Sequence, residues 1–287
     1  MTEDQPELIQ SFNSTDRKIS PGFAYPNIKS VVALFFIFLL YTIIVGIALG
    51  TVLIFLDVLR IKSSLITSFV NLLAYITSQL LLIKYALKKS KKYSDIGPAV
   101  NFTRIEAWLI PILIISTIAL VVLLDRTASW IPMPNSVQKF FERMFTKDVF
   151  SIATMTIIAP ILEEIFARGI VLKGLLKNYH PYKAILISAI FFAALHLNPW
   201  QAIPAFIGGL FLGWVYYKTQ SVIPGIIVHA TINTTASLFF FLPQHPEDFF
   251  SLLGSTWYII ACLLAATVFC TGCYIINKRT AVTALVI

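Results

Sequence analysis

Charged residues are scarce in this sequence. Only 13% of its 287 residues are Asp, Glu, Lys or Arg, while 57% are hydrophobic, and the mean hydropathy is +0.81. Soluble domains usually carry about 25% charged residues. The composition therefore predicts an all-α polytopic membrane protein. Because the basic residues gather between apolar runs, the net charge of +8 indicates contact with the lipid bilayer and predicts no nucleic-acid partner.

Cysteine and the common protease motifs are also rare or absent. The three cysteines all lie in the last apolar run, with no second C-x-x-C to complete a zinc site, so we expect them to be packing residues. The sequence has no G-x-S stretch for a nucleophilic serine, no G-D dipeptide for an aspartyl site and no H-E-x-x-H. Serine, aspartyl and helical zinc-protease chemistry of those kinds is not predicted.

Eight apolar segments remain, and we expect about eight transmembrane helices. The segments are Val31–Leu56, Ser63–Ile83, Ala107–Leu124, Val149–Leu176, Ala184–Leu197, Gln201–Tyr217, Ser221–Leu242 and Ser255–Ile276. In the second, Asn71 and Gln79 are expected to face other helices. In the sixth, Gly208, Gly209 and Gly213 predict close helix packing.

The domain organisation follows from these segments. Residues 1–29 lack the features of a signal peptide and are expected to form a loose cytoplasmic tail. Residues 30–146 hold the N-terminal transmembrane helices and an amphipathic segment, residues 147–243 a catalytic core, and residues 244–287 the last helix and a tail. The amphipathic segment, Ser136–Thr146, is expected to lie at the membrane interface with Val137, Phe140, Phe141, Met144 and Phe145 on one face. It could gate the substrate or simply pack on the surface.

The distribution of Lys and Arg predicts the orientation. With the N-terminus inside, fifteen Lys and Arg residues fall in inner segments and six in outer segments. Basic residues are enriched in cytoplasmic loops, so both termini are expected in the cytoplasm of a multi-pass cell-membrane protein.

Two adjacent carboxylates and an arginine interrupt the fourth apolar segment. No charge occurs from Val149 to Leu162, and after Arg168 none occurs until Lys173. An ionised group within a membrane is costly and is by default a candidate functional residue. Glu164 and Arg168 are four residues apart and can pair on one helical face, while Glu163, rotated by about 100°, can point into a cavity. We therefore expect a structural Glu164–Arg168 pair and a reactive Glu163, although the whole cluster could be structural.

Three further polar residues lie at a similar depth. His196 ends the fifth segment, with Phe192 one turn before it, and His229 and Asn233 lie one turn apart on the seventh. From the expected cytoplasmic edge, Glu163, His196 and His229 are about 15, 20 and 12 Å deep, and Asn233 is about 18 Å deep. These residues can therefore meet at one site.

A carboxylate and imidazoles that share a site can activate water. Glu163, as general base helped by His196, would deprotonate the water, and His229 and Asn233 would donate hydrogen bonds to the oxyanion. Alternatively Glu163, His196 and His229 could hold a divalent metal such as zinc that acidifies the water. The sequence leaves both schemes open, together with a proton-coupled transporter that uses the same residues as a relay and a non-catalytic scaffold or immunity protein.

Three motifs in this order resemble those of the CPBP family of CAAX proteases and bacteriocin-processing enzymes, which are similar to the Ras-converting enzyme. The motifs are E-E-x-x-x-R (Glu163, Glu164, Arg168), F-x-x-x-H (Phe192, His196) and H-x-x-x-N (His229, Asn233). The resemblance covers about residues 147–243. It implies an eight-helix fold around a cavity open to the cytoplasm and the lipid, and an intramembrane endopeptidase acting on a membrane-associated peptide or lipidated protein.

The resemblance also assigns roles to the residues. By analogy Glu163 and His196 activate the water, and His229 and Asn233 bind the oxyanion, with Glu164, Arg168 and Phe192 in support. Members of the family are often labelled metalloproteases, although a metal-free glutamate mechanism is argued for them as well. In bacteria the family is linked to bacteriocin maturation, self-immunity and surface-protein processing.

Overall fold

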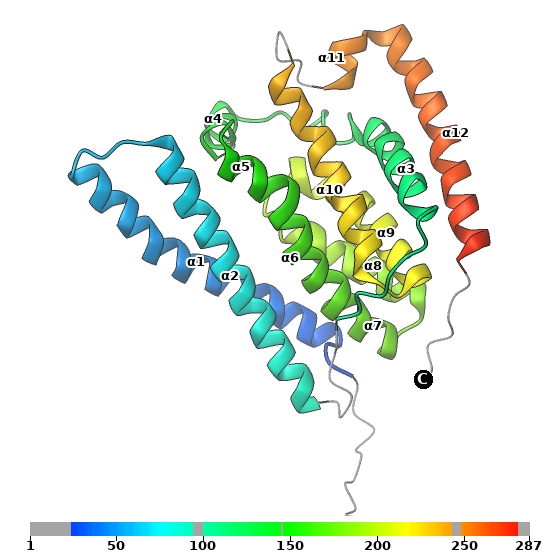
Figure 1. The fold of residues 1–287 in the computed structure, drawn as a ribbon, viewed down its shortest axis with the longest axis horizontal. Helices are drawn as coiled ribbons and strands as arrows, with labels where there is room; N and C mark the ends of the chain where they lie inside the picture. Colours follow the sequence, from blue (N-terminus) through cyan, green and yellow to red (C-terminus); the bar gives the residue numbers. More distant parts are fainter. Residues whose placement is uncertain (1–23, 94–99, 145, 243–247, 281–287) are drawn as a thin grey trace, which may run out of the picture.

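The computed structural model describes residues 24–93, 100–144, 146–242 and 248–280, and within these ranges the chain is helical and has no β-strand. The helices are α1 (Ile28–Val58), α2 (Ser64–Tyr93), α3 (Leu109–Leu124), α4 (Asn135–Met144), α5 (Val149–Ala153), η1 (Thr154–Ile158), α6 (Ala159–Phe166), η2 (Ala167–Leu172), α7 (Lys173–Asn178), α8 (Pro181–Ala194), α9 (Pro199–Thr219), α10 (Val222–Leu238), η3 (Phe239–Phe241), α11 (Phe249–Leu253) and α12 (Ser255–Arg279). In Figure 1, α1 and α2 form a hairpin beside the bundle made by the other helices. The prediction of an all-α protein is confirmed.

Each of the eight predicted segments contains a helix, but the helices differ in length. Four helical runs of the described chain are long and apolar enough to cross a membrane, namely Ile28–Val58, Ser64–Lys92, Val149–Asn178 and Ser255–Arg279. The apolar helices α3, α8 and α10 have 16, 14 and 17 residues. At about 1.5 Å per residue they reach about 21–26 Å, less than a hydrocarbon core of about 30 Å. The protein is a multi-pass membrane protein, and the count of eight spans stays a prediction.

The run from Val149 to Asn178 contains two π-helical turns, η1 and η2, on either side of α6. Pro160 accounts for the first, because proline lacks an N–H and its ring clashes with the carbonyl four residues earlier. In the widened turn the N–H of Ala159 bonds to the carbonyl of Thr154, five residues back. The carbonyl of Met155 is thereby left without a helical donor, since its other possible partner is Pro160.

Close packing of α9 against α8 depends on glycine. A Cβ at Gly209 would lie 3.3 Å from Ala189 Cα, and a Cβ at Gly213 would lie 3.0 Å from Ile185 Cγ2. The predicted close packing at these small residues is confirmed. It brings the backbone of α9 near the helices that carry the charged cluster.

Helix α2 is held against α5 by Asp148, which caps α5. Asp148 accepts hydrogen bonds from the N–H groups of Phe150 and Ser151, and from the hydroxyls of Ser68 (2.6 Å) and Thr146. Burial by itself raises the pKa of Asp148, but these hydrogen bonds outweigh burial and lower the pKa to about 2. The capping carboxylate is therefore ionised at neutral pH and joins α2 to the start of the charged run.

The N-terminal segment is only partly described. Residues 1–23 of the predicted loose tail lie outside the described ranges. Residue 24, in contrast, is fixed to the end of α7, because Ala24 and Asn178 exchange hydrogen bonds of 2.8 and 2.7 Å. At Gly174 a Cβ would lie 2.3 Å from Pro26 Cδ, so glycine permits this contact.

The amphipathic segment is helical, as α4. Of its predicted apolar face, Val137 and Phe141 are half-buried. The side chains of Phe140, Met144 and Phe145 lie outside the part of the chain that the structure describes. Whether α4 gates a substrate stays a prediction.

Candidate active site

Glu164 and Arg168 form a wholly buried ion pair. Arg168 Nη1 donates to Glu164 Oε1 at 2.7 Å, and neither side chain is exposed. Arg168 Nη2 donates to the carbonyl of Gly209 at 3.2 Å, and the guanidinium lies 4.5 Å from the ring centroid of Phe192. The predicted pairing is confirmed, and Arg168 connects the charged run to both α8 and α9.

Glycine makes room for this pair on α10. A Cβ at Gly225 would lie 2.6 Å from Glu164 Oε2. Among the described residues, Glu164 Oε2 and Arg168 Nε have no hydrogen-bond partner. The Glu164 carboxylate is therefore closely packed, with no space on that side for a second reactant.

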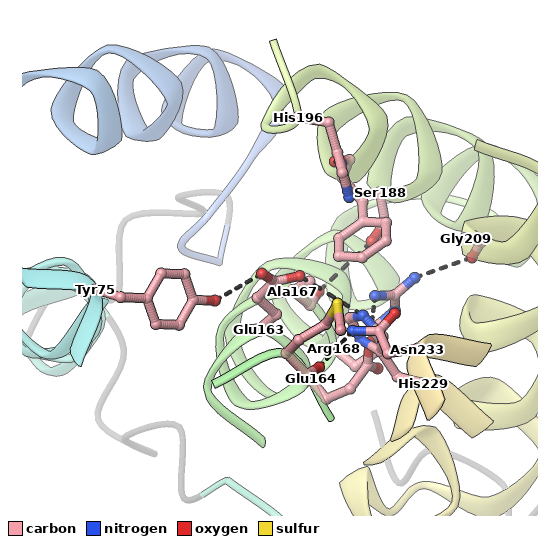
Figure 2. Close-up of polar contacts among 12 residues, drawn as sticks. Tyr75, Glu163, Glu164, Ala167, Arg168, Ser188, His196, Gly209, His229 and Asn233 are labelled. Atoms are coloured by element: carbon pink, nitrogen blue, oxygen red, sulfur yellow. Dashed lines mark hydrogen bonds and ion pairs between the residues drawn. The ribbon is translucent and has the colours of Figure 1, made fainter. Parts of the chain in front are cut away.

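Glu163 has different surroundings. Its side chain is 21% exposed, while that of Glu164 is fully buried. Oε1 accepts a hydrogen bond of 2.6 Å from the hydroxyl of Tyr75, and Oε2 lies 3.8 Å from His229 Nε2. Figure 2 shows Tyr75 and His229 approaching Glu163 from opposite sides. The structure therefore confirms the predicted placement of the two carboxylates, in which Glu164 belongs to a buried ion pair and Glu163 is accessible.

His229 lies between the two glutamates. Its Nδ1 is 3.1 Å from Glu164 Oε1, and its Nε2 faces Glu163. Because a carboxylate only accepts hydrogen bonds, the contact with Glu164 requires the proton on Nδ1. On the other side the separation of 3.8 Å is too short for a water between the two atoms, but a water beside the pair can contact both His229 and Glu163.

Phe192 lies against both histidines. Its ring centroid is 5.2 Å from that of His196 and 5.5 Å from that of His229, in edge-on geometry. His196 is half-buried, and its Nδ1 lies 3.0 Å from the carbonyl of Phe192. A carbonyl only accepts, so this contact places a proton on Nδ1, and in the neutral ring the lone pair is then on Nε2.

Asn233 contacts the first π turn. Its Nδ2 donates to the carbonyl of Met155 at 2.8 Å. This is the carbonyl that Pro160 and the π turn leave without a helical donor. The bond fixes the direction of the carboxamide and uses one of its two N–H donors.

The residues do not fit a metal centre as they stand. Within the described ranges, no group of three His, Cys, Asp or Glu side chains is arranged to hold a metal ion. Of the predicted ligands, Glu163 and His229 approach each other at 3.8 Å, and the bond from His196 Nδ1 to a backbone carbonyl leaves its Nε2 free. We therefore derive no step through a metal.

The sequence did not predict the roles of Tyr75, the carbonyl of Met155 and Gly225, nor that the carbonyl of Gly209 accepts from Arg168. A signal for Tyr75 was present, since Asn71, Tyr75 and Gln79 recur at a spacing of four on one helical face. Gln79 is buried as expected, whereas Asn71 is exposed.

Comparison with known proteins gives one family. Residues 145–235 match the family described as type II CAAX prenyl endopeptidase Rce1-like. No curated protein and no solved structure matched the chain. The matched segment contains all the predicted site residues, whereas Tyr75 lies outside it.

Proposed function

Since residues 145–235 match the Rce1-like family of CAAX endopeptidases, we propose that this membrane protein hydrolyses a peptide bond in a membrane-associated CAAX-like substrate. The observation that supports this proposal most directly is the different placement of two adjacent carboxylates. Glu164 is buried in an ion pair, and Glu163 is accessible beside His229. A prenylated peptide is the substrate class that we propose first. A bacteriocin or surface peptide is the alternative within the same reaction. The proton-coupled transporter is not favoured, because the matched family consists of endopeptidases.

Glu163 is proposed as the general base. A water beside Oε2 and His229 Nε2, which are 3.8 Å apart, would lie within hydrogen-bond reach of the carboxylate. Glu163 takes a proton from this water while the water oxygen attacks the carbonyl carbon of the scissile bond. The lone pair on Nε2 of His196 is proposed to orient the water.

His229 and Asn233 are proposed to stabilise the oxyanion. Asn233 retains one N–H after its bond to Met155. His229 is proposed to donate from Nε2 in the form in which both ring nitrogens carry protons, with Nδ1 directed at Glu164. Glu163 then passes its proton to the leaving nitrogen as the C–N bond breaks, which gives a carboxylic acid and an amine.

The test uses the purified protein in lipid nanodiscs and a fluorescence-quenched peptide that ends in a farnesylated CAAX sequence. We expect Glu163→Gln to lower kcat by at least about 100-fold, because a general base contributes roughly 10²–10⁴ in rate. Asp57→Asn is the control, since Asp57 lies in an exposed ion pair at the end of α1. A chelator is expected to leave the rate unchanged, as the metal-free scheme requires.

Two results would contradict the proposal. Equal cleavage by the wild type and Glu163→Gln would exclude Glu163 as the base. A wild type that binds the farnesylated peptide but cleaves neither it nor any other peptide of a membrane-peptide library would indicate a scaffold. Loss of activity on chelation, restored by zinc, would instead favour the metal-dependent scheme.

A further inference from the structure

We propose that Tyr75 is a positioning residue of the active site, which holds Glu163 so that only Oε2 faces the substrate. This inference rests on the proposed endopeptidase function and deepens it. It brings α2, outside the matched family segment, into the catalytic arrangement. The observation behind it is the hydrogen bond of 2.6 Å from the Tyr75 hydroxyl to Glu163 Oε1.

The hydrogen bond divides the two carboxylate oxygens by function. Oε1 is engaged by Tyr75, while Oε2 faces His229 Nε2 at 3.8 Å. A glutamate side chain has three rotatable bonds, and one contact on Oε2 alone would leave it several rotamers. The second contact, on Oε1, removes that freedom and leaves Oε2 as the oxygen that accepts the proton of the water.

The geometry also constrains which group donates. A carboxylate only accepts hydrogen bonds when ionised, so the phenol supplies the proton of this contact. The hydroxyl therefore satisfies Oε1 with a donor, in a part of the membrane where few polar groups are available.

The position of Tyr75 is fixed by the packing of α2. Ser68 donates to Asp148 at 2.6 Å, and the ring of Phe69 lies 5.1 Å from that of Phe150. Ser68 precedes Tyr75 by seven residues, two helical turns, and thus lies on the same face of α2. These contacts anchor α2 to the start of the run that carries Glu163. The packing of the two helices therefore directs the Tyr75 hydroxyl at the carboxylate.

The first test is Tyr75→Phe, which removes only the hydroxyl, assayed with the farnesylated quenched peptide in nanodiscs. We expect kcat to fall by about 10- to 100-fold, the effect of losing one hydrogen bond to a charged group, with KM unchanged. The matched control is Tyr85→Phe, which makes the same chemical change ten residues further along α2 and should leave both constants unchanged. An unchanged kcat in Tyr75→Phe would overturn the proposal. A rise in KM with kcat preserved would overturn it too, because Tyr75 would then bind the substrate.

A second measurement covers the case in which Tyr75→Phe does not fold. 4-Aminophenylalanine introduced at position 75 keeps the ring and replaces the hydroxyl by an amino group, which still donates a hydrogen bond to Glu163 Oε1. We expect this variant to keep kcat within about threefold of the wild type, because the donor to Glu163 is retained. A folded variant that loses activity although it keeps the donor would overturn the proposal. If Glu163→Gln were fully active, the proposed function would fail first, so the two failures are distinguishable.

Discussion

Glu163 and Glu164 are neighbours of identical chemistry whose surroundings separate them. The side chain of Glu164 is fully buried, bound to Arg168 and His229, and packed on Gly225. Removing one partner of a buried pair leaves the other charge unsatisfied, which costs about 3–5 kcal/mol. The two carboxylates should therefore respond to mutation in different ways.

We predict that Glu164→Ala lowers the free energy of unfolding by about 3–5 kcal/mol, because Arg168 would stay buried without its partner. Thermal unfolding in detergent, followed by circular dichroism, measures this loss. The control is Asp57→Ala, which breaks the exposed Asp57–Lys62 pair and should cost less than about 1 kcal/mol. A Glu164→Ala protein of normal stability but no activity would mean that the roles of the two glutamates are interchanged.

At the scale of residues, local spacing predicted some contacts and missed others. The Glu164–Arg168 pair follows from a spacing of four within one helix, so the sequence predicted it. Tyr75 and Glu163 are 88 residues apart in the sequence and lie on different helices, and no local pattern specifies which helices are neighbours. The partner of Asn233 could not be predicted either, because it exists only where a π turn releases a carbonyl.

The first π turn is an element whose shape depends on a single proline. Pro160 has no N–H for the carbonyl of Met155, and Asn233 supplies the missing donor from α10. In Pro160→Ala the new N–H competes for this carbonyl or allows the turn to contract to an α-helix. Asn233 would then lose the bond that sets its direction.

We predict that Pro160→Ala lowers kcat by about tenfold, the effect of one neutral hydrogen bond, while the melting temperature is unchanged or higher. Stability is not expected to fall, because a proline inside a helix costs about 3 kcal/mol relative to alanine. Peptide cleavage and thermal unfolding of the same preparation measure both quantities. The control is Pro204→Ala inside α9, which should have the same effect on stability without the loss in kcat. Full activity of Pro160→Ala would show that the π turn does not position Asn233.

At the scale of elements, the apolar runs predicted where helices occur but not where they end. The fifth segment was expected to continue to Leu197, whereas α8 ends at Ala194. Leu197 adopts φ 58°, which a helix cannot continue, and Asn198 then caps α9 ahead of Pro199. His196 consequently lies just beyond a helix end, where its Nδ1 reaches the carbonyl of Phe192.

The segments that were predicted to face the cytoplasm lie together at one end of the molecule. The start of α1 and the C-terminal ends of α2 and α7 lie at the bottom of Figure 1. Hydrogen bonds join Ala24 to Asn178 there, and Asn101 to the backbone of Gln220 and Val222. Most of the predicted cytoplasmic lysines belong to these segments, namely Lys84, Lys88, Lys89, Lys91, Lys92, Lys173, Lys177 and Lys218. Each lysine near an anionic leaflet contributes about 1 kcal/mol, so their combined preference favours the cytoplasmic side for this end.

We predict that Lys88 lies on the cytoplasmic side of the membrane and Lys62 on the opposite side. Both side chains are exposed. Lys62 lies two residues before α2, and the helix rises about 36 Å from Ser64 to Lys88, which exceeds a hydrocarbon core of about 30 Å. The measurement uses Lys62→Cys and Lys88→Cys in a chain whose three native cysteines are replaced by alanine, with a maleimide that does not cross membranes. In intact cells Lys62→Cys should react and Lys88→Cys should react only after permeabilisation. The reverse pattern would place the basic end, and the access route to Glu163 that we expect there, on the outer side.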